Sequence, residues 1–143
     1  MSLNQNRLAL EIVSVEEICF SGFAGYVIVP GIEGEIGVYP NHTPLITKIK
    51  PGTLRFKNID SDVEDIFFVA GGILEIQPKI VTVLADTAVR GKDLDEQRAL
   101  DAKKKAEDLL QSSGDKVTLA VAQSELATAI AELSTISKVR GRK

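Results

Sequence analysis

Apolar and polar residues alternate with a period of two over residues 8–85. Apolar runs rich in β-branched and aromatic residues recur there, separated by turn-forming pairs such as Ser21-Gly22, Pro51-Gly52 and Gly71-Gly72. A period of two is typical of strands with one buried face, and tight turns without intervening helices favour antiparallel pairing. The pattern therefore predicts an antiparallel β-sandwich of about ten strands.

From Asp93 onward the period changes to 3.6, which indicates helices. Asp93 with Glu96 three residues later resembles a capping box, and Gly114 provides a stop signal for this first helix. A second helix is predicted to open near Thr118. The apolar stripes are Ala99, Ala102, Ala106, Leu109 and Leu110 in the first helix, and Leu119, Ala122, Leu126, Ala129, Leu133 and Ile136 in the second. The second stripe has heptad spacing, so we predict an antiparallel two-helix hairpin.

These patterns divide the chain into a β-sandwich domain, residues 1–89, and a helical hairpin with a basic tail, residues 90–143. The helical stripes are rich in alanine, which buries little apolar area, so we expect the hairpin to be held only modestly to the sandwich. Arg90-Gly91-Lys92 is the predicted hinge, which suggests regulation through a change of hairpin position.

Composition narrows the function classes. The chain has 143 residues, a net charge of -3, one cysteine and one histidine. It is not basic enough for general nucleic-acid binding, and it has neither an apolar signal core nor an apolar run long enough to span a bilayer. Phosphate-binding loops, nucleophile elbows, zinc-protease motifs and cysteine pairs are missing from the sequence. We therefore expect no catalytic residues, no metal site and no nucleic-acid partner.

Residues 30–45 form the most distinctive segment, because glycines at 31, 34 and 37 and prolines at 30, 40 and 44 exclude a helix. Glu33 and Glu35 are two residues apart, so on an extended chain both side chains point the same way. They form either an ordinary solvated connection or a face that binds a partner. We expect His42 to anchor the loop or contact a partner rather than to act as a base.

Four blocks in this order resemble the epsilon subunit of a bacterial F-type ATP synthase: Gly34-Glu35-Ile36-Gly37-Val38-Tyr39-Pro40-Asn41-His42-Thr43-Pro44-Leu45, Gly71-Gly72-Ile73-Leu74-Glu75-Ile76-Gln77-Pro78, Val81-Thr82-Val83-Leu84-Ala85-Asp86 and Asp93-Leu94-Asp95-Glu96-Gln97-Arg98-Ala99. The likeness runs from about Leu8 to Ile136. Asn41 replaces the glycine that is common after this proline, and both residues tolerate a positive φ.

The resemblance implies a non-catalytic subunit of the central stalk that couples rotation between the c-subunit ring and the catalytic head. Its implied partners are the gamma subunit, the c-ring and the beta subunits. Glu33, Glu35 and His42 are the implied c-ring contacts, and the helices are implied to inhibit ATP hydrolysis. The implied location is the cytoplasmic face of the bacterial inner membrane, with membrane contact only through the complex.

Members of this family that bind ATP carry the motif Ile/Leu-Asp-x-x-Arg-Ala, which Leu94, Asp95, Arg98 and Ala99 match. The resemblance therefore implies weak ATP binding and no other cofactor. Val89 stands where such members carry a carboxylate, and the second helix has no arginine before Arg140. From the residues alone, Asp95 and Arg98 also suit the first turn of a helix. The alternative to a stalk subunit is a free-standing nucleotide-sensing protein of the same architecture.

Overall fold

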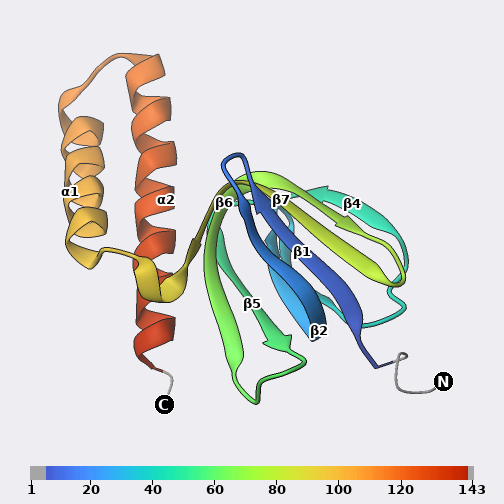
Figure 1. Cartoon of the computed structure of the whole chain (residues 1–143). Coiled ribbons are helices and arrows are strands. Elements are labelled where there is room, and N and C mark those ends of the chain that lie inside the picture. The colour runs from blue at the N-terminus through green and yellow to red at the C-terminus, as the bar shows by residue number, and fades with distance from the viewer. Residues whose placement is uncertain (1–5, 142–143) are drawn as a thin grey trace.

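The computed structural model describes residues 6–141 and shows a curved β-sheet structure with a helical hairpin beside it (Figure 1). The strands are β1 Leu8–Ser14, β2 Ile18–Gly31, β3 Gly34–Val38, β4 Leu45–Lys48, β5 Gly52–Asn58, β6 Glu64–Ile76 and β7 Ile80–Arg90. The short 3-10 helix η2 (Gly91–Asp93) leads into α1 (Glu96–Ser112) and α2 (Lys116–Arg140). The predicted class, a β-sandwich followed by a two-helix hairpin, is confirmed.

The strand order is β1-β7-β6-β5-β2-β3, with β4 paired to β6 and β1 also paired to β2. Among the described strands one pairing, β1 with β7, is parallel, where the sequence predicted antiparallel pairing throughout. A parallel pair needs a long connection, and here the other strands of the sandwich supply it. The β1–β2 pairing closes the sheet on itself, and β3 is left as an edge.

The described chain contains seven strands, because some of the predicted runs join into longer ones. Gly71-Gly72, predicted as a turn, lies inside β6, and both residues have positive φ values of 71° and 112°. Residues before this pair bond to β5, and residues after it bond to β4. A Cβ on Gly72 would clash with the Leu84 carbonyl oxygen. The glycines therefore bend β6 from the part of the sheet that contains β5 toward the part that contains β4, where the sequence suggested a break between two strands.

The sandwich has its own apolar core. The main cluster is built entirely from strand residues and Ile49, with no residue of the described helices in it. Its fully buried members with the largest side chains include Phe56, Phe67, Leu10, Ile12 and Leu54. Full burial of a side chain of this size contributes about 1.5–3 kcal/mol. Sandwich folding therefore draws mainly on contacts that the hairpin does not provide.

The caps of both helices differ slightly from the sequence prediction. Asp95, not Asp93, caps α1, and its side chain accepts a hydrogen bond from the Arg98 backbone N–H. Asp93 lies in η2, two residues before the cap. Asp115 caps α2 through the Thr118 N–H, so this helix opens just before the predicted Thr118. The residue after α1 is an extended Ser113, so the predicted glycine stop at Gly114 does not form a left-handed cap.

The predicted stripe of α2 is confirmed, since all of its members are buried or half-buried. In α1, Ala99 and Ala106 are buried, but Ala102 is exposed and Lys103 is half-buried. Residues 99, 103, 106 and 110 follow the alternating spacing of four and three that keeps side chains on one helix face. Ala102 lies one position off that stripe.

Candidate functional site

The hairpin meets the sandwich through α2, which contacts β5, β6 and η2. At this interface Thr135 of α2 and Thr53 of β5 are 0% and 5% exposed, and their hydroxyl oxygens lie 2.6 Å apart. The Thr135 hydroxyl also donates to the Ala131 carbonyl oxygen at 3.0 Å. Because each hydroxyl has one hydrogen, this arrangement leaves Thr53 as the donor to Thr135. Ile136, which follows Thr135 in the sequence and belongs to the predicted stripe, is also buried.

The β6 strand is covered on both faces where α2 lies against it. Phe67 and Val69 belong to the sandwich core, so the alternating residues Ile66 and Phe68 face the other way. Ile66 and Phe68 are nevertheless buried, at 8% and 2% exposure. Because α2 contacts β6, we attribute this burial to the hairpin. The docked helix thus covers apolar surface that would otherwise face solvent.

The predicted hinge is folded into this interface. Gly91 is buried in η2, and a Cβ on it would lie 2.6 Å from Cγ2 of Val139 in α2. The guanidinium of the preceding Arg90 lies over the Phe67 ring, 4.9 Å from its centroid, and donates to the Cys19 carbonyl oxygen at 3.3 Å. In the docked state this segment is therefore a packed turn, not an open loop.

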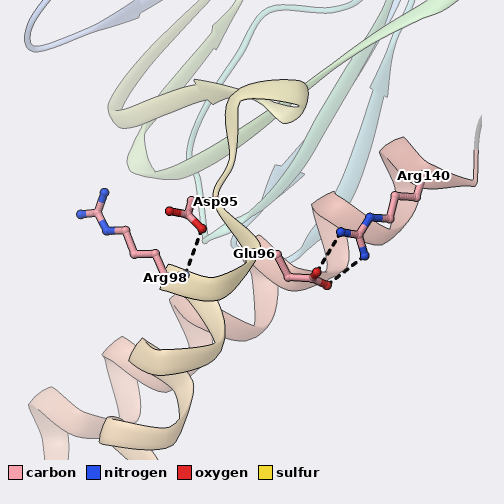
Figure 2. Close-up of polar contacts among 4 residues, drawn as sticks. All are labelled: Asp95, Glu96, Arg98 and Arg140. Carbon is pink, nitrogen blue, oxygen red and sulfur yellow. Dashed lines mark hydrogen bonds and ion pairs between the residues drawn. The ribbon is translucent and has the colours of Figure 1, made fainter.

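The open end of the hairpin is joined by an ion pair between Arg140 and Glu96 (Figure 2). The two guanidinium nitrogens lie 3.0 and 2.8 Å from the two carboxylate oxygens. The hydrogen bond to Glu96 raises the pKa of Arg140 above its usual value. The basic tail predicted from the sequence runs from Lys138 to Lys143, and its Arg140 is already paired. Its last two residues, Arg142 and Lys143, lie outside the described residues.

The four residues of the nucleotide motif do not converge on one space. Asp95 serves as the helix cap, and Ala99 is buried at 1% exposure. Leu94 is half-buried and Arg98 is exposed. In Figure 2 the Arg98 guanidinium extends away from Glu96 and Arg140, and no dashed line joins it to the carboxylate of Asp95. Nucleotide binding by these residues stays a prediction.

The groove between the two helices, about 320 Å³, carries more acid than base. Its lining includes Glu125, Glu132 and Lys105. Burial raises the pKa of the Glu132 carboxyl, and the positive charge of Arg98 partly opposes this shift. The Glu132 carboxyl near Arg98 is an unfavourable neighbour for a polyphosphate.

The three predicted c-ring residues are separated along β3. Glu33 lies in the turn between β2 and β3, and Gly34 beside it has a φ of 131°. The premise that Glu33 and Glu35 share an orientation on an extended chain therefore does not hold. Half-buried His42 lies beyond the other end of β3, and a strand of this length spans about 13 Å. Its Nδ1 is 2.6 Å from the Thr43 carbonyl oxygen.

Glu35 lies on β3 and lines a groove of about 610 Å³ between the sandwich rim and α2. Lys50 and Lys138 line the same groove. Asn41 has a φ of 69°, the one positive value among the described non-glycine residues, and its N–H donates to the Pro78 carbonyl oxygen at 2.8 Å. The expected glycine-like conformation at Asn41 is thus confirmed. The c-ring contact itself stays a prediction.

Sequence reasoning missed the Thr53–Thr135 pair. Thr135 directly precedes Ile136, a residue of the apolar stripe of α2. This position was the only sequence signal that Thr135 could be buried. Nothing in the sequence connects it to Thr53, which is 82 residues away.

The described residues form a sandwich with an independent core and a helical hairpin docked on its outside. The family model of the ATP synthase delta/epsilon chain beta-sandwich domain matches residues 7–91, and that of its long alpha-helix domain matches residues 92–137. The chain therefore belongs to the ATP synthase delta/epsilon chain family.

Similar proteins agree with this assignment. The chain is 50% identical over 137 residues to an ATP synthase epsilon chain of Chromobacterium violaceum, covering 96% of this chain and 98% of the relative. It is 52% identical over 138 residues to that of Herminiimonas arsenicoxydans, covering 96% and 99%. A chain in the Euglena gracilis mitochondrial ATP synthase has the same fold, with a TM-score of 0.83 at 18% identity, covering 92% of this chain and 82% of that one.

Within residues 6–141, neither α1 nor α2 combines the length and the apolar character that a membrane-spanning helix requires.

Proposed function

We propose that this chain is a non-catalytic epsilon subunit of the ATP synthase central stalk. It couples rotation between the c-ring and the catalytic head and restrains ATP hydrolysis through its C-terminal helices. The family match over both the sandwich and the helices, residues 7–137, is the observation that carries this proposal.

In this proposal residues 1–89 form the stalk domain, held by the gamma subunit and seated on the c-ring. Glu33, Glu35 and His42 are the proposed c-ring contacts. β3 is an edge strand, whose unpaired backbone groups are available to a partner, and a contact that includes all three residues would run along it. The chain would then lie at the cytoplasmic face of the bacterial inner membrane and meet the membrane only through the complex.

Residues 90–143 form the proposed regulatory domain. The hairpin contributes nothing to the main sandwich core, which supports its separation from the sandwich without global unfolding. After undocking, Lys103, Lys104 and Lys105 would meet an acidic surface on the beta subunits of the catalytic head. Salt screens attraction between such exposed charges, so the restraint should weaken at high ionic strength.

Removal of residues 94–143 tests the inhibitory role. We expect the shortened chain, assembled with the same catalytic core, to give faster ATP hydrolysis than the full chain and to retain coupled ATP synthesis. Because the cut exposes Ile66 and Phe68, gel filtration must first show that the shortened chain is monomeric. Equal hydrolysis rates at every ionic strength would contradict inhibition by the hairpin.

Weak ATP binding at Leu94, Asp95, Arg98 and Ala99 is tested separately with the isolated chain. Saturable amide shifts in α1 during an ATP titration to millimolar concentration would support it, provided that Arg98→Gln abolishes them. Absence of such shifts would leave Asp95 as a helix cap only. The alternative of a free-standing nucleotide sensor also predicts that the chain purifies alone, whereas a stalk subunit co-purifies with a membrane-bound ATPase.

A further inference from the structure

The hairpin is attached to the sandwich by one side of one helix. In Figure 1, α1 lies on the far side of α2 from the sandwich. The upper part of the hairpin extends beyond the sandwich. Two close contacts of this junction come from the last turns of α2, at Thr135 and Val139. The hydroxyl pair is thus a buried polar contact within the interface between α2 and the sandwich.

A buried hydroxyl pair has an unusual effect on a docking equilibrium. Both hydroxyls exchange their mutual hydrogen bond for water when the interface opens, so the net gain from docking is small. Two valines, which have the same shape but a methyl group in place of each hydroxyl, would instead gain free energy of docking by leaving water. The two threonines therefore hold the hairpin less tightly than two valines would.

We propose that the Thr53–Thr135 hydroxyl pair is a polar latch that keeps the docked and undocked hairpin close in free energy. It favours the register in which the hydroxyls meet and leaves opening easy. Its consequence for hydrolysis rests on the proposed inhibitory role of the hairpin, but the latch itself is a property of the isolated chain.

The two sides of the latch are not equivalent. Thr135 keeps an acceptor in its own helix, the Ala131 carbonyl, whereas Thr53 has its hydrogen bond to Thr135 alone among the described residues. Thr135→Val therefore leaves a buried donor on Thr53 without a partner. Thr53→Val removes the donor and leaves Thr135 bonded to Ala131. Replacement of both threonines removes the polar requirement entirely.

Amide hydrogen exchange of the last turns of α2 and of η2 in the full-length chain measures this opening. We expect Thr135→Val to raise the exchange rate about tenfold, the size expected for one unsatisfied buried group. Thr53→Val should raise it less, and the double variant should exchange more slowly than the wild type; exchange equal to that of the wild type would show that the threonines do not loosen docking. Thr128→Val is the matched control, because the Thr128 hydroxyl donates to the Ser124 carbonyl oxygen of the same helix, and it should change little.

Two other results would overturn the latch: unchanged exchange in Thr135→Val, or a double variant whose effect is the sum of the two single effects in free energy. Equal loss of protection throughout α1 and α2 would also overturn it, because it would indicate hairpin unfolding. Thr135→Ser, which keeps the hydroxyl, should remain more protected than Thr135→Val. If exchange follows these expectations but hydrolysis by the assembled enzyme does not, the latch stands and the inhibitory role fails.

Discussion

Val139 of α2 packs directly on Gly91 of η2, so that a single added methyl group at position 91 would lie 2.6 Å from Val139 Cγ2. The same methyl would meet the Ile66 carbonyl oxygen at 3.2 Å. The glycine is therefore required by close approach of the docked helix. Its φ is not in the left-handed region, so alanine is compatible with the backbone itself.

Gly91→Ala should displace the end of α2 and favour the undocked hairpin by about 1–3 kcal/mol, the usual penalty of overpacking. Backbone amide shifts in η2 and the last turn of α2 will report the displacement. Val139→Ala removes the clashing methyl group, so the double variant Gly91→Ala/Val139→Ala should dock better than Gly91→Ala alone. Wild-type amide shifts in Gly91→Ala would show that the contact does not constrain docking.

Arg140 and Glu96 should hold the open end of the hairpin closed in a salt-dependent way. Their side chains are 64% and 41% exposed, so salt screens the pair and its contribution to stability is modest. We expect Glu96→Gln to increase amide exchange in the first turn of α1 and the last turn of α2 at low salt. The difference from the wild type should disappear at high salt. Lys104→Gln is a suitable control, since its 4.0 Å pair with Asp108 lies within α1. A difference that persists at high salt would exclude an ionic origin.

Glu132 should make hairpin stability depend on pH. Burial raises the pKa of its carboxyl above 4.5, so the folded hairpin binds the proton more tightly than the unfolded chain does. Stability from this group is therefore gained as the pH falls through the raised pKa and lost as the pH rises above it. Glu132→Gln should raise the melting temperature at pH 8, and this gain should shrink toward pH 5.

Circular dichroism melts of both chains at pH 5 and pH 8 will measure the effect. This range lies above the pKa of the Asp115 cap, which hydrogen bonds from Thr118 lower, so that the cap stays ionised. Glu125→Gln, an exposed change in the same groove, should not reproduce the gain. A pH-independent gain in Glu132→Gln would point to packing and not to titration.

Replacement of Asn41 by glycine should preserve the stability of the chain, whereas replacement by alanine should lower it. Its φ of 69° is in the left-handed region, which costs an ordinary residue about 1–2 kcal/mol. Asn41→Gly should leave the free energy of unfolding nearly unchanged, and Asn41→Ala should lower it by about that amount. Urea unfolding of the two variants tests this difference. Equal stability of the two would show that the loop relaxes to another conformation.

The sequence alone was sufficient for the class of fold, because periodicity is a local property. Alternation predicted strands, and the change to a 3.6-residue period at Asp93 located the helices to within a few residues. The heptad stripe of α2 and the turn-compatible Asn41 were also predicted correctly. Each of these features depends on neighbours close in the chain, so short stretches of sequence contain the information.

The tertiary structure alone decided which surfaces meet. Thr53 and Thr135 are 82 residues apart, and each threonine by itself is an ordinary polar residue. Periodicity could not show that Gly71-Gly72 bends β6 instead of ending it, nor that β3 separates Glu33 from His42. Periodicity could indicate that one face of a strand or helix is buried, but it could not identify the element that covers this face. Partners distant in sequence are selected by packing of the whole chain, and that is why the contacts that hold the hairpin to the sandwich became visible only in the folded molecule.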